Sequence, residues 1–303
     1  MPGSAGPIGD VSAISGEDRR IIETATAHGL EDKTLVRIRQ GALRTECYVK
    51  PAAPNQLEAY LDAELKQTIH VNEGFTPGAT IESLNADDWA VVVGIKYYPG
   101  LRDLKGPVDD ATEFKNWALN SGYVPDRQLI FLQSPAQRPA TTAEAQPTGA
   151  AITQAFETLI RAARPKKFHY LGRRLYLFFS GHGIVAMRAT TPDYSEAALL
   201  TADADQLFMK HVSLRSWAEW FRAYGIFDEV LLFADCCREQ EDFVPPAAPS
   251  PPPWPRQREA GCQFYVFSTT LAAKAWEQEL GKPPRYRGVL SFVGGSEERQ
   301  AVR

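Results

Sequence analysis

The most regular hydrophobic pattern in this chain lies between positions 89 and 267, where short apolar runs alternate with amphipathic stretches. The runs are rich in β-branched and aromatic residues at successive positions, which is typical of parallel strands covered on both faces. They predict strands at 90–95, 128–132, 174–179, 229–234 and 263–267.

The stretches between these runs have hydrophobic residues at helical spacing. The first predicted helix begins at Asp109 and Asp110, and carboxylates favour a helix N-terminus because of the helix dipole. Alternating strands and helices predict an α/β fold, a mostly parallel sheet with helices on both faces. The apolar stripes are Ala111, Phe114 and Ala118; Ile152, Phe156, Leu159 and Ile160; and Leu214, Trp217, Ala218 and Phe221.

The N-terminal part of the chain has a different pattern. Residues 1–20 are rich in Gly, Ser, Ala and Pro without periodicity, which predicts a mobile leader. Residues 56–66 place Leu57, Tyr60, Leu61 and Leu65 on one helical face. We therefore expect residues 1–85 to form a leader and a small appendage of unknown role, with residues 1–80 available to a partner protein. Residues 86–303 are predicted to form the main domain.

Composition narrows the class of protein. Hydrophobic residues make up 44% and charged residues 23% of the chain, as in soluble globular proteins. A net charge of −4 without a basic stripe argues against nucleic acid binding. The apolar runs are too short to span a bilayer, no targeting segment is evident, and four cysteines do not form a disulfide framework for this length. These features predict a cytoplasmic protein that is not associated with membranes.

A proline-rich tract, 244–256, separates the last two predicted strands. Such a sequence forms neither a helix nor a paired strand, so we expect an exposed, extended loop. The simplest role of this loop is that of a spacer.

Candidate chemistry lies where two predicted strands end, since parallel sheets bind ligands at the carboxyl ends of their strands. The predicted strand 174–179 leads to His182, which lies between two glycines. The predicted strand 229–234 leads to Asp235, Cys236 and Cys237. A free thiol is only a few per cent ionised at neutral pH and needs a nearby base to become a nucleophile. His182 can supply that base to Cys237.

These motifs resemble those of the caspase, metacaspase and bacterial orthocaspase clan, the peptidase C14-like cysteine peptidases. Cys237 follows His182 by 55 positions (237 − 182), close to the separation of about 50 in caspases. The resemblance covers about residues 88–293. The matching segments are Val91 to Ile95, Leu104 to Gly106, Asp109 to Ala111, Phe178 to Gly183, Leu199 to Ala204, Phe233 to Arg238, Ser268 to Thr270, Trp276 to Glu277 and Gly288 to Phe292.

The resemblance implies a cysteine endopeptidase that hydrolyses protein or peptide substrates with a dyad of His182 and Cys237. It places Asp235 in a pocket for an Arg or Lys before the scissile bond, with Asp203 as a second candidate, because a buried carboxylate needs a cation. The backbone N–H groups of Gly183 and Cys237 are the candidates for the oxyanion hole. No cofactor or metal is expected; some metacaspases require calcium, but no dense carboxylate cluster indicates a calcium site here.

Several alternatives remain open at this stage. Arg238 and Glu239 stand where many relatives have small residues, which would crowd the cleft. The chain ends at Arg303 where the family usually continues with a helix, so a truncated domain is one alternative. An inactive caspase-like scaffold that binds a partner is the main competing interpretation. A flavodoxin-like nucleotide binder needs a glycine-rich loop that Tyr97 to Gly100 does not provide. A zinc site of His182, Cys236 and Cys237 lacks the usual ligand spacing and a fourth ligand.

The other candidate residues have structural interpretations. Cys236 is expected on the face opposite Cys237, and the remaining cysteines and histidines are predicted to be structural, surface or capping residues. We also expect an active enzyme to cut itself within the proline-rich loop, after Arg256 or Arg258. The residues assigned no chemistry are Cys47, Cys262, His28, His70, His169 and His211.

Overall fold

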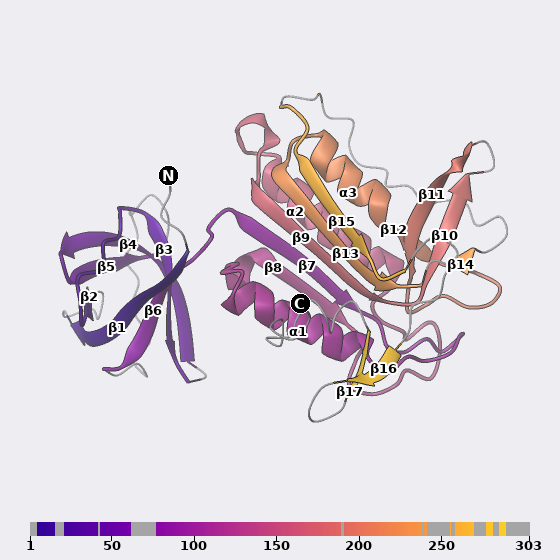
Figure 1. The fold of residues 1–303 in the computed structure, drawn as a ribbon, viewed down its shortest axis with the longest axis horizontal. Coiled ribbons are helices and arrows are strands. Elements are labelled where there is room, and N and C mark those ends of the chain that lie inside the picture. Colours follow the sequence, from indigo (N-terminus) through magenta and orange to yellow (C-terminus); the bar gives the residue numbers. More distant parts are fainter. Residues whose placement is uncertain are drawn as a thin grey trace, which may run out of the picture. The chain divides into compact units, whose positions relative to one another are not determined.

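The computed structural model divides the chain into two compact units, which are treated separately (Figure 1). The first unit comprises Met1–Ala86 with Ala118–Gln128, and the second comprises Asp87–Trp117 with Leu129–Arg303. The structure describes residues 5–15, 21–41, 43–61, 77–188, 191–237, 239–240, 255, 258–269, 277–280 and 285–288.

The first unit is built around a closed barrel of six strands in the order β1-β2-β5-β4-β3-β6, in which all neighbours are antiparallel. Closure leaves no strand edge unpaired. Its strands are β1 (Gly6–Ser15), β2 (Ile21–Thr24), β3 (Thr34–Gln40), β4 (Leu43–Ala53), β5 (Gln56–Tyr60) and β6 (Ala79–Ser83), and a short 3-10 helix, Asp126–Gln128, also belongs to this unit.

The barrel corrects two sequence predictions. The helix expected at 56–66 is wrong, because its first part is strand β5, in which Leu57 and Ala59 alternate into the barrel core. The mobile leader is also wrong for Gly6–Ser15, which pairs with both β2 and β6 and buries Val11. Leucines at positions 57, 61 and 65 mimic helical spacing, but Leu61 is exposed and residue 65 lies outside the described residues.

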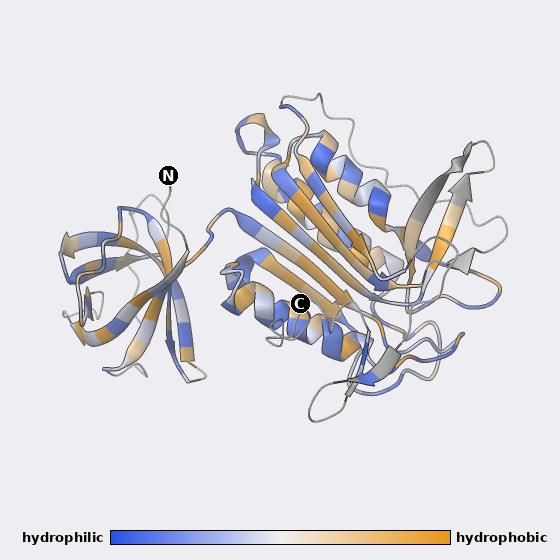
Figure 2. Ribbon diagram, in the orientation of Figure 1, coloured by the Kyte–Doolittle hydropathy of each residue, from blue (hydrophilic) through white to orange (hydrophobic). Residues whose placement is uncertain are grey.

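The second unit contains the predicted parallel sheet, so the α/β prediction is confirmed for this unit. The strand order is β15-β13-β9-β7-β8, with all neighbours parallel. The strands are mostly orange in the hydropathy view, as expected of a sheet covered on both faces (Figure 2). Their bounds are β7 (Asp88–Gly94), β8 (Leu129–Gln133), β9 (Gly172–Gly181), β13 (Phe227–Cys236) and β15 (Cys262–Phe267).

Helices cover both faces of this sheet. Successive residues of a strand point to opposite faces. Phe178 stacks on Phe114 of α1 (Pro107–Asn120), with ring centroids 4.5 Å apart, whereas Phe179 meets Phe156 of α2 (Gly149–Ala163) at 6.3 Å. Helix α3 (Leu214–Ala223) lies on the α2 side, because its aromatic residues pack against Phe156. The sheet therefore forms the middle layer of three.

Smaller elements complete the second unit. A four-stranded sheet has the order β12-β11-β10-β14, and β16 pairs with β17 in an antiparallel two-stranded sheet. Their bounds are β10 (Gly183–Arg188), β11 (Thr191–Leu200), β12 (His211–Ser213), β14 (Glu239–Gln240), β16 (Glu277–Leu280) and β17 (Arg285–Gly288), and Lys167–His169 forms a second 3-10 helix.

Candidate active site

His182 and Cys237 follow directly on two neighbouring central strands. In the parallel register of β9 and β13, Ser180 is opposite Asp235 and Gly181 is opposite Cys236. The next residue on each strand is His182 and Cys237, respectively. Because neighbouring strands lie about 4.8 Å apart, this register places His182 and Cys237 side by side at the carboxyl end of the parallel sheet.

The two adjacent cysteines have different surroundings. Cys236 is 1% exposed and belongs to the hydrophobic core, whereas Cys237 is half-buried. Gly183 lies against this segment so closely that a Cβ there would overlap the Cys237 carbonyl oxygen. Ile184 then pairs with Glu239 in parallel fashion, so the chain beyond the histidine runs beside the chain beyond the cysteine.

The ring of His182 is oriented by a backbone carbonyl. Its Nε2 lies 2.7 Å from the oxygen of Arg102, in the loop after β7. A carbonyl oxygen only accepts hydrogen bonds, so Nε2 carries the proton and donates it. In the neutral ring, Nδ1 is then the nitrogen that can accept a proton.

Asp235 belongs to an acidic cluster with Asp110 and Glu113 of α1, in which the two aspartates are buried and Glu113 is exposed. The side chain of Asp235 is against Gly288 of β17, where a Cβ would overlap the carboxylate. Arg287 donates from Nε to Asp110 at 2.6 Å and binds Glu113 with both terminal nitrogens. Gly288 donates its backbone N–H to Asp110 at 2.9 Å. One guanidinium therefore pairs with two of these carboxylates, Asp110 and Glu113.

Burial in this cluster affects the protonation of Asp110. The pKa of Asp110 is raised to about 7, chiefly by burial and also by the neighbouring Asp235, although Arg287 and the Gly288 N–H act in the opposite direction. Asp110 is therefore close to half-protonated at neutral pH. A further cation placed near the cluster would favour its ionised form.

Asp203, the second carboxylate predicted from the sequence, has partners on its own segment. It accepts hydrogen bonds from Thr201 at 2.7 Å and from Lys210 at 3.0 Å. Burial opposes ionisation, but these two bonds outweigh it and lower the pKa of Asp203. Its charge is thus already compensated by Lys210.

Sequence reasoning missed the participation of Asp110, Glu113 and Arg287 in this cluster. Asp110 was interpreted only as a helix-starting residue, and Arg287 follows it by 177 positions, so no local pattern links them. The one signal in the sequence is that two aspartates, Asp109 and Asp110, begin the helix where one would suffice. In the structure Asp109 is exposed, as a residue at a helix start usually is, whereas Asp110 is 1% exposed.

Several predicted positions lie outside the described residues. These are Arg238, His70, Thr270, Trp276, residues 289–303 with the closing segment to Phe292 and the terminal Arg303, and the proline-rich loop except for Pro255. Arg258 is described: it forms an ion pair with Asp228 at 2.8 Å and lies over the Tyr170 ring.

The other described cysteines and histidines have surroundings of their own. Cys47 is buried in the barrel, and burial raises the pKa of its thiol to about 12, while Cys262 is exposed on β15. His169 and His211 each place Nδ1 within hydrogen-bonding distance of a backbone carbonyl. Among the described residues, no group of three or more His, Cys, Asp or Glu side chains is arranged to hold a metal ion.

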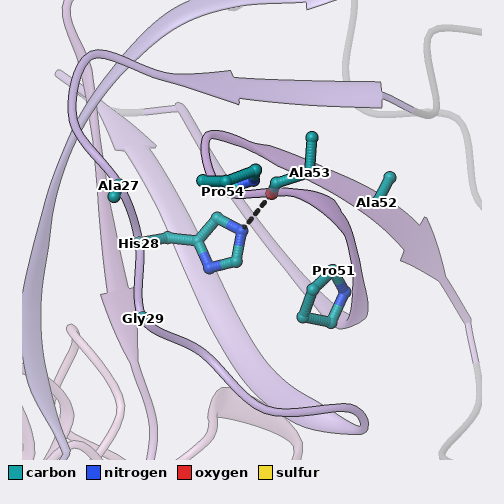
Figure 3. Close-up of a pocket in the computed structure, with 7 residues that line it drawn as sticks. All are labelled: Ala27, His28, Gly29, Pro51, Ala52, Ala53 and Pro54. Carbon is teal, nitrogen blue, oxygen red and sulfur yellow. Dashed lines mark hydrogen bonds between the residues drawn. The ribbon is translucent and has the colours of Figure 1, made fainter.

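His28 lines a pocket of about 330 Å³ in the barrel unit together with prolines and alanines (Figure 3). Its Nδ1 accepts the N–H of Leu30, so Nε2 is the protonated nitrogen and donates to the Ala53 carbonyl at 3.0 Å. Both ring nitrogens thus bind the local backbone.

No described helix is long and apolar enough to cross a membrane.

Comparison with known proteins gives one family match. Residues 89–213 match the model described as the metacaspase, peptidase C14 domain. This segment includes His182 and Asp203 but ends before Cys237. A search of curated proteins gives no match.

Two solved structures show weak similarity to the chain. Protein GSU0716 from Geobacter sulfurreducens is 18% identical, with a TM-score of 0.33 and 50% of each chain covered. An intact type IV self-sufficient cytochrome P450 monooxygenase is 12% identical, with a TM-score of 0.19, and the match covers 70% of this chain and 33% of the other. The chain thus spans half the first structure and a third of the second, and scores this low establish no common fold.

Proposed function

Because the chain carries a caspase-like domain of the peptidase C14 family, recognised over residues 89–213, we propose that it is a cysteine endopeptidase with Cys237 as nucleophile and His182 as general base. The observation that carries this proposal is the register of β9 and β13, in which the two residues follow paired positions at the carboxyl end of the sheet. The contrast between core-buried Cys236 and half-buried Cys237 supports the choice of the second cysteine.

The proposed reaction is acyl transfer followed by hydrolysis. Nδ1 of His182 accepts the thiol proton, and Cys237 Sγ attacks the peptide carbonyl to form a tetrahedral intermediate. The imidazolium gives its proton to the leaving amine as the C–N bond breaks, and water then hydrolyses the thioester. The backbone N–H groups of Gly183 and Cys237 are the proposed donors to the oxyanion, each worth roughly 3–4 kcal/mol.

We propose that Asp235 and Asp110 select an Arg or Lys before the scissile bond. Asp235 is two residues from the nucleophile, and Asp110 is close enough for their charges to interact. The chain's own Arg287 supports this specificity, because it shows that the acidic cluster accommodates a guanidinium. A substrate cation would form charge-assisted hydrogen bonds with these carboxylates.

Fluorogenic peptides with Arg, Lys, Gln or Asp before the scissile bond test the activity and its specificity together. We expect hydrolysis of the Arg and Lys peptides, and loss of hydrolysis in Cys237→Ala and His182→Ala. Preference for Asp would contradict the acidic pocket but leave the peptidase assignment standing.

A second candidate function is an inactive caspase-like scaffold that binds a partner. Arg287 favours it to the extent that it already occupies the acidic cluster. A thiol-reactive peptide probe separates the two candidates, because only a working dyad labels at Cys237 and loses the label in His182→Ala. Absence of labelling in correctly folded wild type would favour the scaffold. Binding of a partner through the barrel stays a proposal under either candidate, as does location in the cytoplasm.

A further inference from the structure

Tyr98 lies in the loop that follows β7 and is fully buried despite its polar hydroxyl group. A buried hydroxyl without a hydrogen bond is costly, so the position of this group depends on what it binds. It binds the segment that carries the proposed general base and the segment that follows it.

The hydroxyl group of Tyr98 holds the main chain at His182. Its oxygen accepts the backbone N–H of His182 at 2.9 Å and its proton is donated to the carbonyl of Leu200 at 3.3 Å. Leu200 in turn donates its N–H to the carbonyl of His182 at 2.8 Å. The backbone of His182 is therefore linked to Leu200 of β11 twice: its carbonyl directly, and its N–H through the Tyr98 hydroxyl.

The phenol ring of Tyr98 also contacts the imidazole. The two ring centroids are 4.8 Å apart with an interplanar angle of 59°. Gly181 makes this approach possible, because a Cβ at position 181 would lie only 2.6 Å from the Tyr98 oxygen. The residue before the histidine thus leaves the space that the hydroxyl occupies.

The backbone of Tyr98 shapes the loop that orients the ring. Its N–H donates to Asp103 Oδ1 at 2.9 Å, and its carbonyl accepts the N–H of Leu101 at 2.8 Å. Arg102 lies inside the turn closed by these bonds, and its carbonyl accepts the proton of His182 Nε2. One residue therefore fixes both the main chain of His182 and the acceptor that sets its tautomer.

We propose that Tyr98 is a positioning residue that holds His182 in the orientation and tautomer required to activate Cys237. This inference rests on the proposed cysteine peptidase function. If the ring is free to turn, the imidazolium stabilises the Cys237 thiolate less well, so the apparent pKa of the thiol rises and its reactivity at neutral pH falls.

The test compares Tyr98→Phe with Tyr97→Phe, a neighbouring tyrosine whose ring lies beside the Lys96 amine instead. The rate of Cys237 alkylation by iodoacetamide is measured from acid to alkaline pH by mass spectrometry of the Cys237 peptide. We expect Tyr98→Phe to react about tenfold more slowly than wild type near pH ~7 and to recover at alkaline pH. Tyr97→Phe should match wild type.

Peptide kinetics provide a second readout. Tyr98→Phe should lower kcat about tenfold with little change in KM, because the hydroxyl touches the base and not the substrate. A merely structural role would lower the melting temperature without moving the alkylation profile. An alkylation profile of folded Tyr98→Phe equal to that of wild type overturns the inference.

Two controls keep the outcomes separate. If wild type and His182→Ala alkylate alike, the proposed function fails, whereas a His182-dependent wild type with an unaffected Tyr98→Phe removes only the positioning role. If Tyr98→Phe does not fold, Asp103→Ala takes its place, since it removes the acceptor of the Tyr98 N–H, and Asp103→Asn retains an oxygen acceptor. We expect slower alkylation in the alanine variant than in the asparagine variant, and equal rates would overturn the inference.

Discussion

Cys236 and Cys237 are adjacent in sequence, but they differ in what surrounds them. The first lies in the core, and its Sγ is close to Gly183, while the second is half-buried after the end of β13. Successive residues on an extended segment point to opposite sides, so only one of the two thiols can face His182.

Replacing each cysteine with alanine separates these roles. We expect Cys237→Ala to abolish peptide hydrolysis at unchanged stability. Cys236→Ala should retain most of the activity and lower the free energy of unfolding by about 1 kcal/mol, as expected of a small core truncation. Activity assays and denaturant unfolding measure the two effects, and the reverse pattern of activities would reject Cys237 as the nucleophile.

If Asp110 belongs to the proposed substrate pocket, its raised pKa predicts a specificity that depends on pH. With a pKa of about 7, Asp110 is largely neutral below pH 7 and becomes a carboxylate above it. We therefore expect KM for an Arg peptide to fall relative to a Gln peptide as the pH rises from about 6 to about 8. Any effect of dyad titration on KM is shared by the two peptides, so it cancels in the ratio of their KM values. In Asp110→Asn this ratio should stay constant with pH; the same slope in that variant would exclude Asp110 from the pocket.

At the scale of elements, the strands of the parallel sheet were predictable because each is an apolar run bounded by turns. The barrel was not, because β1 is rich in Gly, Ser and Ala, and β5 combines strand alternation at Leu57 and Ala59 with leucines at helical spacing. The strand-end residues His182 and Cys237 could be found from the sequence. The pairing of α1 with β17 through Arg287 could not, because it depends on tertiary contacts between distant segments.

The β17 strand supplies Arg287, the cation that pairs with the buried Asp110, so the loss of this side chain should be costly. We expect Arg287→Gln to lower the free energy of unfolding by about 3 kcal/mol at pH ~8. The loss should be smaller at pH ~6: without Arg287 the folded-state pKa of Asp110 lies further above its unfolded value, so the folded state gains stability by binding a proton as the pH falls. Denaturant unfolding at several pH values measures this.

The exposed pair of Arg161 and Glu157 provides the matched control for that experiment. Arg161→Gln should cost no more than about 1 kcal/mol, because both partners are largely solvated. Equal effects of the two substitutions would mean that the cluster around Asp110 is not a buried ion pair.

The position of Arg258 bears on self-cleavage. It is held by Asp228 near the beginning of β13, whereas Cys237 follows the end of this ten-residue strand, about 30 Å away for an extended chain. We therefore expect cleavage after Arg258 to occur between molecules and not within one. Cleavage after Arg256, which lies outside the described residues, stays a sequence prediction.

An inactive Cys237→Ala chain offers the direct measurement. Mixed with wild type, it should acquire a new N-terminus at Glu259 or Gln257, detected by mass spectrometry, at a rate proportional to wild-type concentration. Cleavage of wild type at Arg258 with a rate independent of concentration would contradict the intermolecular route.

At the scale of the whole molecule, the two units have separate hydrophobic cores. The first unit includes residues 118–128, which the chain contributes from the middle of the second unit's sequence. Arg37 links this segment to the barrel strands, because it binds the carboxylates of Glu46 and Glu82 and the carbonyls of Leu119 and Val124.

A substitution at Arg37 should therefore affect stability and leave catalysis unchanged. We expect Arg37→Met to lower the free energy of unfolding by about 3 kcal/mol, since it removes the fully buried cation that pairs with Glu46 and Glu82. Below the unfolding transition, kcat and KM for an Arg peptide should equal those of wild type. A changed KM in the folded variant would show that the first unit influences substrate binding.

The register that joins His182 to Cys237 also determines when reactivity can arise during synthesis. The histidine strand leaves the ribosome first and can pair with β7, but in the proposed dyad the thiol meets its base only after β13 has docked beside β9. On this proposal, a nascent or unfolded chain carries a thiol of ordinary reactivity. In a refolding experiment, the time at which Cys237 begins to alkylate rapidly would then report when β13 docks beside β9.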